Sequence, residues 1–297
     1  MKDYYIYYNN NFVRQSNATL PVLSASTQFG LNVFEGIRIY KEDAYYVFRL
    51  EDHLKRLNNS LNQIGFKTKI ISSKNFVEIL KELMILNDIK TDFSIRFTYL
   101  VKEVESWSSN SNPVFFIAPL IRERNSSDYF KTIVLTKIRR ISSLAMDMKV
   151  KCGANYINGR YALLEAKSKG ADLPILKNKD GFISESTGAC IFLVKNGVVV
   201  TPSLDSDILE SITRDTVIKI LIENDYKIEE RHVLEEDLNE SDEIFLCGTS
   251  AEITPIKLLG IKDFKIGDLT KFISKEYKYA TTAKKYKNYS WTTKFKI

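Results

Sequence analysis

The stretch that decides the fold is Gly30-Leu-Asn-Val-Phe-Glu-Gly-Ile-Arg38. Five further blocks follow it in order along nearly the whole chain: His53-Leu-Lys-Arg-Leu57, Lys151-Cys-Gly-Ala-Asn-Tyr156, Ile183-Ser-Glu-Ser-Thr-Gly188, Ile212-Thr-Arg-Asp215 and Gly248-Thr-Ser-Ala-Glu-Ile-Thr-Pro255. Each block alone is weak evidence, because a short motif is only a hypothesis until its structural context is known. Six blocks that agree in order and approximate spacing are together strong evidence for the class of protein. The helices and strands predicted around them indicate where each block lies.

The composition is that of a globular protein. The chain has 297 residues, of which 44% are hydrophobic and 27% charged, enough for one large domain or two of ordinary size. No apolar run approaches the roughly 18 residues that a membrane span requires. The N-terminus lacks the apolar core of a secretory signal. We therefore expect a cytoplasmic protein that does not act at a membrane.

Cysteine and histidine usage argues against disulfide and metal chemistry. The three cysteines, Cys152, Cys190 and Cys247, are odd in number and far apart, which excludes a disulfide framework and a CxxC zinc pattern. Only His53 and His232 are available for a histidine-rich metal site. No metal is therefore predicted.

The formal net charge of +6 is concentrated near the C-terminus, where Lys and Tyr interleave over residues 271–297. A basic stretch of this kind can bind nucleic acid, but a basic balance more often serves solubility and anionic metabolites. We favour a solvated helix, with Tyr279, Trp291 and Phe295 packed on the domain. No nucleic-acid partner is predicted.

Helices and strands are predicted in both halves of the chain, so the class is α/β or α+β. A hairpin over residues 4–13 turns at Asn9-Asn10, and a second hairpin turns at Asn196-Gly197. Apolar spacing predicts helices over 51–65, 73–87, 156–169 and 213–223, the last with Thr213 at its start as an N-cap-like residue. Strands are predicted over 93–101, 113–121, 133–138, 173–176, 191–195, 198–201 and 243–247. The polar stretch from Arg122 to Asp128 is the best candidate for a connection between domains.

In order and approximate spacing, the six blocks resemble those of the fold-type IV pyridoxal-phosphate enzymes, and residues 33–38 look most like the branched-chain aminotransferase branch. The resemblance implies the two-domain α/β architecture of D-amino-acid-aminotransferase-like enzymes. It predicts a smaller N-terminal domain over residues 1–120 and a larger cofactor-binding domain over 121–297. The cofactor is expected between them, and a partner subunit is expected to close the pocket of a homodimer.

The resemblance implies that Lys151 bonds covalently to pyridoxal 5'-phosphate and serves as the catalytic residue. Such a lysine must lose its proton in a partly desolvated pocket. Lys149, two residues earlier, is the rival that the residues themselves leave open. Glu185 matches the acid that keeps the cofactor's pyridine nitrogen protonated, and Tyr156 matches the tyrosine that reaches its phenolic oxygen.

The cofactor phosphate requires N–H donors and a cation. Ile212 and Thr213 open a predicted helix, whose N-terminal amides and dipole favour an anion. Thr249 follows a strand in a tight turn and adds a hydroxyl. Arg56 lies off the apolar stripe of its helix and matches the phosphate-binding arginine of the family.

Phe34, Gly36, Arg96 and Ser250 fall on family positions that line the substrate side. The match is thinner here than at the cofactor residues. Phe29 and Ser94 stand where the branch commonly has phenolic hydroxyls. Two further departures are Ala189-Cys190, in place of the usual Glu-Asn, and Leu120-Ile-Arg-Glu-Arg-Asn125, in place of an aromatic-rich connection. These departures leave the cofactor residues intact. Phe29 and Ser94 predict that glutamate is a poorer partner than in the branch.

The resemblance implies a transaminase of branched-chain amino acid metabolism and biosynthesis. It would move an amino group between a hydrophobic L-amino acid and a 2-oxo acid such as 2-oxoglutarate. Within the same fold, an aminodeoxychorismate-type lyase or a D-amino-acid transaminase would also use Lys151, and residues 35–38 argue against both. A basic binding protein without catalysis is the alternative from another class. The preferred substrates and any assembly beyond a dimer are left open.

Overall fold

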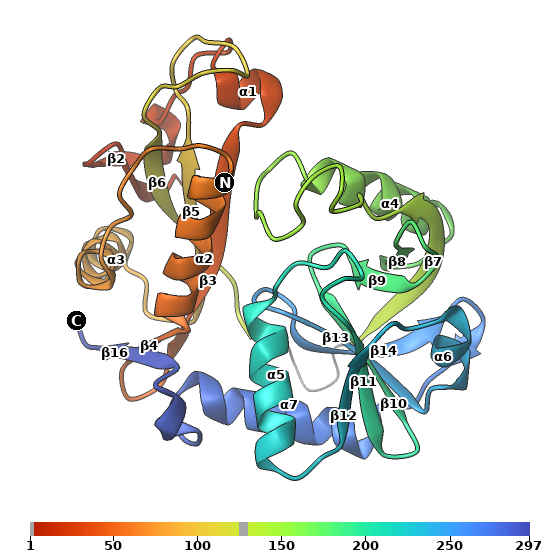
Figure 1. Ribbon diagram of the computed structural model, residues 1–297. Helices are drawn as coiled ribbons and strands as arrows, with labels where there is room; N and C mark the ends of the chain where they lie inside the picture. The colour runs from red at the N-terminus through yellow and green to blue at the C-terminus, as the bar shows by residue number, and fades with distance from the viewer. Residues whose placement is uncertain (1–2, 125–129) are drawn as a thin grey trace. The chain divides into compact units, whose positions relative to one another are not determined.

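The computed structural model describes residues 3–124 and 130–297. The chain forms two compact units. The first comprises Met1–Arg124, Val150–Ala154 and Ala280–Ile297, and the second comprises Asn125–Lys149 and Asn155–Tyr279. Each unit has its own sheet and its own helices (Figure 1). The predicted connection over 122–128 runs partly outside the described residues, and the division into domains at residue 120 stays a prediction.

Among the described residues, the first unit holds a seven-stranded sheet in the order β16-β4-β3-β5-β6-β1-β2. All of its neighbouring strands run antiparallel. The strands are β1 (Tyr5–Tyr8), β2 (Asn11–Arg14), β3 (Asn32–Lys41), β4 (Tyr45–Phe48), β5 (Phe93–Leu100), β6 (Val114–Ile121) and β16 (Thr292–Phe295). The predicted hairpin is confirmed, since Asn9 and Asn10 both have positive φ, as a two-residue turn between antiparallel strands requires.

Two helices of the first unit pack their apolar stripes on this sheet. They are α2 (Leu50–Gln63) and α3 (Ser73–Asn87), and α2 lies along β3 (Figure 1). Leu54, Leu57 and Leu61 of α2 belong to the same buried cluster as Val33 and Ile37 of β3. The helix predicted over 73–87 is observed with the same bounds, and Ser72 caps it by accepting a hydrogen bond from the Asn75 amide. The unit also contains the short helices α1 (Ala25–Phe29), η1 (Gln15–Asn17) and η2 (Lys287–Tyr289).

The C-terminal residues 280–297 complete the first unit. β16 adds to β4, and Phe295 stacks on Tyr45 with 5.6 Å between ring centroids. Trp291 is also buried and packs edge-on against Phe48. The prediction that Trp291 and Phe295 pack on the protein is therefore confirmed.

The second unit is built on a mixed sheet. In the described residues it runs β12-β11-β10-β13-β14-β7-β8-β9, with β15 paired to β14. The strands are β7 (Lys131–Arg139), β8 (Leu173–Lys177), β9 (Ile183–Ser186), β10 (Cys190–Lys195), β11 (Val198–Pro202), β12 (Ile228–Arg231), β13 (Glu243–Gly248), β14 (Glu252–Leu259) and β15 (Lys262–Asp263). The helices are α4 (Tyr156–Ser168), α5 (Ile212–Glu223) and α6 (Glu235–Glu240), with α7 (Asp268–Thr281) near the C-terminus.

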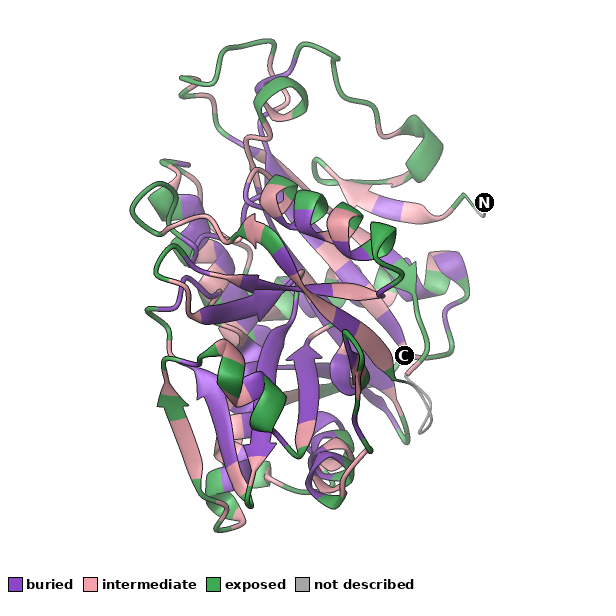
Figure 2. Cartoon of the chain, turned by 90° about the vertical axis from the view of Figure 1, so that its right-hand side faces the viewer, coloured by how far each residue is buried: buried purple, intermediate pink, exposed green. Residues whose placement is uncertain are grey.

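The strands of the second unit are largely buried and the outer faces of its helices are exposed (Figure 2). This pattern matches a sheet covered by helices and confirms the predicted α/β class. The predicted N-cap at Thr213 is wrong. Helix α5 begins one residue earlier, and Ser211 caps it by accepting from the Arg214 amide, since Ser211 has the extended backbone that a cap requires.

Candidate active site

Backbone hydrogen bonds hold Lys151 in place within the first unit. β4 pairs with β3 only over residues 39–41, so that side of β3 is open further toward its N-terminus. There the Phe34 amide donates to the Lys151 carbonyl at 3.0 Å, and Val33 forms a bridge with Cys152. The Lys151 amide donates to Ser60 Oγ of α2 at 3.1 Å. The short segment 150–154 therefore behaves as an added strand, and Lys151 has a fixed position on β3.

The Lys151 side chain is partly buried, and its Nζ lies 5.1 Å from the ring centroid of Phe34. Lys149, the rival lysine, has a side chain that is 57% exposed and pairs with Glu210 at 3.5 Å. The Lys151 amine is thus partly enclosed beside an aromatic ring, whereas the Lys149 ammonium lies in solvent next to a carboxylate. The surroundings of Lys151 therefore suit a reactive amine better than those of Lys149.

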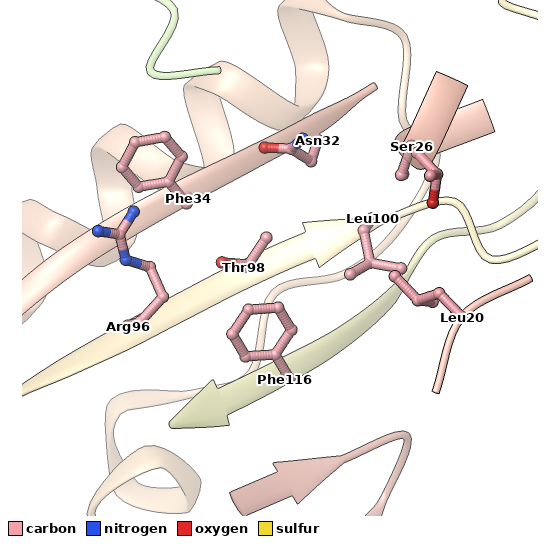
Figure 3. Close-up of a pocket in the computed structure, with 9 residues that line it drawn as sticks. Leu20, Ser26, Asn32, Phe34, Arg96, Thr98, Leu100 and Phe116 are labelled. Atoms are coloured by element: carbon pink, nitrogen blue, oxygen red, sulfur yellow. The ribbon is translucent and has the colours of Figure 1, made fainter. Parts of the chain in front are cut away.

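Phe34 and Arg96 meet at one end of a cavity of about 360 Å³ in the first unit. The Arg96 guanidinium lies 4.3 Å from the Phe34 ring centroid, so that Phe34 contacts both Arg96 and Lys151. Figure 3 shows these two side chains together, with Thr98 and Phe116 beside them and Asn32, Ser26 and Leu20 toward the other end. The cavity thus combines an apolar wall with one cation at its end.

Gly36 pairs with Arg96 in the β3–β5 register. A Cβ built on Gly36 would meet nothing within 4 Å, and its φ does not lie in the left-handed region. Neither packing nor backbone geometry requires glycine here. The open space beside Arg96 is therefore available to a ligand.

Arg56 lies in a buried polar network with Glu35 and His53. Its Nε and Nη2 donate to the two oxygens of Glu35 at 2.7 and 2.8 Å. His53 Nδ1 lies 2.7 Å from Glu35 Oε2, and both His53 and Glu35 are almost completely buried. The expectation that Arg56 stands apart from the packed face of its helix is only partly right, because its side chain is 12% exposed.

Glu185, on β9 of the second unit, is buried and paired with Arg140. Arg140 Nη2 lies 2.7 Å from one Glu185 oxygen, and the Leu209 amide donates to the other at 3.3 Å. Leu209 comes three residues before α5, so Glu185 lies near the segment that leads into that helix. An ionised carboxylate at this position is stabilised by a cation and by an amide.

The other predicted residues of the second unit lie on neighbouring elements. Ile212 and Thr213 form the first turn of α5, where amides lack acceptors within the helix. Thr249 and Ser250 form the turn between β13 and β14. A Cβ on Gly248, just before this turn, would lie 3.0 Å from the Gly188 carbonyl, so the turns at 188 and 248 lie side by side.

Tyr156 is the first residue of α4. Gly159 of the same helix contacts Thr187, whose hydroxyl donates to the Gly159 carbonyl at 3.4 Å. The start of α4 therefore packs against the turn that follows Glu185. In the second unit, contacts therefore link the segments that carry the predicted cofactor residues. These are Tyr156, Glu185, the start of α5 and the turn at Thr249.

Sequence reasoning assigned no role to Glu35, His53 or Arg140. Glu35 and His53 stand inside the quoted blocks, so the blocks themselves were the available signal. No pattern pointed to Arg140. Two of the departures from the family pattern, Phe29 and Ser94, lie in the first unit, and Phe29 is 44% exposed at the end of α1. Ser94 lies two residues from Arg96, on the same face of β5.

Within the described part of the chain, no group of three or more His, Cys, Asp and Glu residues could hold a metal ion. No helix among the described residues is long and apolar enough to cross a membrane.

Comparison with known proteins gives the class. Residues 32–259 match the family model of the class IV amino-transferases, and the chain belongs to this family. A probable branched-chain-amino-acid aminotransferase of Aquifex aeolicus is 31% identical over 300 residues, covering 97% of this chain and 96% of that protein.

Solved structures agree with this relationship. The branched-chain aminotransferase of the archaeon Thermoproteus uzoniensis, crystallised with norvaline, superimposes with a TM-score of 0.92 at 31% identity, covering 98% of this chain and 99% of that one. The branched-chain amino acid aminotransferase from Thermobaculum terrenum in its PLP-form (holo-form) gives a TM-score of 0.88 at 31% identity, covering 98% and 97%. The expected two-domain, fold-type IV architecture is confirmed as the fold class.

Proposed function

We propose that the chain is a pyridoxal-phosphate-dependent transaminase that moves an amino group between a hydrophobic, branched-chain-like L-amino acid and a 2-oxo acid such as 2-oxoglutarate. The single observation that carries this proposal is the partly buried Lys151, held on β3 and next to Phe34. Membership of the class IV aminotransferases, and the branched-chain activity in the names of the relatives, support it.

The donor set of the chain fits the cofactor chemically. Lys151 would hold it covalently, Glu185 would face its pyridine nitrogen, and Tyr156 would reach its phenolic oxygen. Arg56, the first-turn amides of Ile212 and Thr213, and Thr249 would hold the phosphate. The fit rests on observed features: a buried carboxylate paired with Arg140, an arginine oriented by Glu35, and a helix N-terminus capped by Ser211. Helix N-termini and arginines are suited to phosphates.

The bound cofactor supplies the electron sink that lets the substrate α-carbon lose a proton. The residues of the chain then divide the remaining work. The Lys151 amine would serve as the base that moves the proton between the substrate α-carbon and the cofactor, because the backbone of Lys151 is held on β3 and its amine is partly buried. The Glu185 carboxylate would hold a proton at the pyridine nitrogen. A keto acid leaves, and a second keto acid takes the amino group in the other half of the cycle.

On the substrate side, we propose roles for Phe34, Gly36, Arg96 and Ser250. Phe34 and the apolar wall of the cavity would favour a hydrophobic side chain, and Gly36 leaves room beside Arg96. Arg96 can bind a second carboxylate bidentately, which would admit a dicarboxylic partner. Ser250 lies in the turn expected to meet the substrate carboxylate.

We also propose that the protein is a cytoplasmic homodimer with domains divided near residue 120. Cys152, Cys190 and Cys247 are buried and form no disulfide, which fits a reducing compartment. The segments around Leu23 and Val104 are linked by a bridge between Ser24 and Val104, and they expose large apolar side chains. Trp107 is 71% exposed and Val22 is 78% exposed, which suits a covered surface. A molar mass of two chains in solution, lowered to one chain by Trp107→Glu with Val22→Asp, is the expected result.

The activity is tested by product formation from L-leucine, L-valine, L-isoleucine and their D-enantiomers, with 2-oxoglutarate as acceptor. We expect the visible absorption band of a bound cofactor and the highest turnover with an L-branched-chain donor. Turnover of D-amino acids alone would favour the D-amino-acid transaminase. Pyruvate release from aminodeoxychorismate would favour the lyase, and a colourless protein without turnover would favour a binding protein.

A further inference from the structure

Glu35 lies on the opposite face of β3 from Phe34 and Gly36, because successive strand residues point to opposite faces. Phe34 faces the cavity, while Glu35 faces α2 among the apolar residues of the core. Its side chain is 0% exposed. A carboxylate in such a place is stable only when its charge is matched and its oxygens are hydrogen-bonded.

Both conditions are met by α2. Arg56 donates to both oxygens of Glu35 through Nε and Nη2, and His53 Nδ1 lies 2.7 Å from Oε2. His53, Arg56 and Ser60 are separated by three and four residues, so they share one face of the helix. Ser60 of this face accepts the hydrogen bond of the Lys151 amide. The same helix face therefore contacts Glu35 and the backbone of Lys151.

Burial and the neighbouring charges shift the pKa values of His53 and Glu35 in this network. Burial lowers the pKa of His53, and the opposing effect of Glu35 does not overcome it. A neutral His53 carries one ring proton, and the Glu35 contact places that proton on Nδ1. Burial by itself would raise the pKa of Glu35, but Arg56 and then His53 hold that pKa well below its usual range. Glu35 is thus ionised, Arg56 is cationic, and His53 donates to Glu35 without adding charge.

The contact between Arg56 and Glu35 is bidentate and uses one edge of the guanidinium. A planar guanidinium that is held at two nitrogens cannot rotate about its own axis. The hydrogen bonds to Glu35 use the edge formed by Nε and Nη2, and Nη1 belongs to the other edge of the guanidinium. A free arginine would lose rotamer entropy when it bound a phosphate, and an arginine already fixed loses much less.

We propose that Glu35 and His53 are positioning residues that preset the Arg56 guanidinium for the cofactor phosphate. This inference rests on the proposed function, specifically on Arg56 as a phosphate ligand. Glu35 touches no reacting atom in it. The carboxylate orients the arginine, and the histidine orients the carboxylate.

Two other roles for Glu35 predict different behaviour. If Glu35 only links α2 to β3, its replacement should weaken the binding of every ligand of the pocket to the same extent. A carboxylate that acts only through its charge would repel a phosphate, so Glu35→Gln would strengthen phosphate binding. Positioning predicts the opposite sign, with weaker binding of a phosphorylated ligand and unchanged binding of the same ligand without phosphate.

The experiment compares pyridoxal 5'-phosphate with pyridoxal, which lacks the phosphate, as ligands of the full-length protein freed of cofactor. Dissociation constants are measured by absorbance titration for the wild type, Arg56→Met, Glu35→Gln, His53→Asn and His53→Leu. The quantity of interest is the ratio of the two constants. Glu243→Gln is the matched control, because Glu243 accepts from the Thr270 amide at 2.9 Å at the start of α7 and has a structural role in the second unit.

Arg56→Met should weaken binding of the phosphate form roughly tenfold to a hundredfold, which corresponds to one charge-assisted contact, and leave pyridoxal unchanged. Glu35→Gln should weaken it about tenfold with the same selectivity. His53→Leu should weaken it about threefold to tenfold. His53→Asn should keep the wild-type ratio, because the asparagine amide can replace the Nδ1–H donor. Glu243→Gln should lower the melting temperature and leave the ratio unchanged.

An unchanged or reversed ratio in Glu35→Gln would overturn the inference. If that variant does not fold, the His53 pair decides, and equal ratios for His53→Leu and His53→Asn would equally overturn it. If Arg56→Met kept the wild-type ratio, the result would show instead that Arg56 does not bind the phosphate. That outcome would count against the proposed function of Arg56 and is distinguishable from failure of Glu35 alone.

Discussion

In each of the two units an arginine and a carboxylate form a largely buried pair, and these two pairs are built in opposite ways. In the first unit, Glu35 is completely buried and holds Arg56, the proposed phosphate ligand, at two nitrogens. In the second unit, Glu185 is the proposed functional group, and Arg140 contacts one of its oxygens at 2.7 Å. The residue that orients its partner is thus the carboxylate, Glu35, in the first unit and the arginine, Arg140, in the second.

The difference shows what a buried ion pair can do besides stabilise the fold. Replacing a buried pair by apolar residues is often neutral for stability, so retention of a pair in a protein interior is weak evidence for a stabilising role. We propose that each pair here fixes the orientation or charge of the partner that binds the ligand. Arg56 needs a fixed plane, whereas Glu185 needs a fixed charge. Variants of the two units should therefore fail in different measurements.

The largest effect should come from Lys151, the residue that both pairs would serve. Lys151→Ala should lower turnover by about 10⁴-fold or more, because it removes the base together with the covalent link to the cofactor. It should also remove the visible band of the lysine-bound cofactor. Lys149→Ala is the matched control and should retain both. Borohydride labelling that maps to Lys149 would show that the lysines were assigned the wrong way round.

Glu185→Gln should give the next largest effect and should act on rate. Loss of a charge-assisted hydrogen bond of about 1.5–3 kcal/mol corresponds to roughly one to two decades in turnover if it acts in the transition state. The cofactor should remain bound, because the phosphate contacts are intact. Turnover and cofactor content measured side by side with Glu35→Gln test the comparison. The two pairs do not have the roles described if Glu185→Gln loses the cofactor but keeps the wild-type turnover per bound cofactor, while Glu35→Gln keeps the cofactor.

A smaller effect is expected on the face of β5 that carries Ser94 and Arg96, which we propose to be the substrate side. Glutamate should be a poor partner in the wild type, and Ser94→Tyr with Phe29→Tyr should raise its catalytic efficiency about threefold to tenfold. Efficiency with leucine should change less, because Phe34 and the apolar wall are unaltered. Kinetics with leucine, valine, isoleucine, an aromatic amino acid and glutamate provide the measurement. Glutamate as the best wild-type donor, with no response to the added hydroxyls, would contradict this interpretation.

The smallest effect concerns the pH dependence of stability. Burial lowers the pKa of His53 in the folded state, in the presence of Glu35, Arg56 and Lys151. As the pH falls below the usual histidine value of about 6.5, the unfolded chain therefore binds a proton before the folded chain does, and stability declines. His53→Asn should reduce this decline by at most about 1.4 kcal/mol per pH unit, the limit for one proton.

Urea unfolding at several pH values between 8 and 5 measures this slope. His232→Asn shows how much of it comes from the other histidine. Above about pH 6.5 the free energy of unfolding should not depend on the ionisation of His53, since it is neutral in both states. A His53→Asn protein with the wild-type slope below that pH would indicate that His53 is protonated in the folded network.

The sequence by itself determined α2, α3, α4 and α5, the two hairpin turns and many of the strands, because apolar spacing and turn residues act over short distances. The short helices α1 and α6 were not predicted. Helix α3 was predicted with its observed bounds, and the turns at Asn9-Asn10 and Asn196-Gly197 have the positive φ expected of them. The family blocks likewise marked Lys151 and Glu185 as candidates.

Strand β3 was not predicted, although it carries the stretch that decides the fold. Its residues are buried on both faces, so it lacks the alternation that marks a half-buried strand. The addition of segment 150–154 to β3 and of β16 to β4, and the pairing of Arg140 with Glu185, were also decided only by the tertiary structure. Strand pairing and buried charge pairs depend on residues that are distant in the chain, so the local sequence around one residue does not identify its partner.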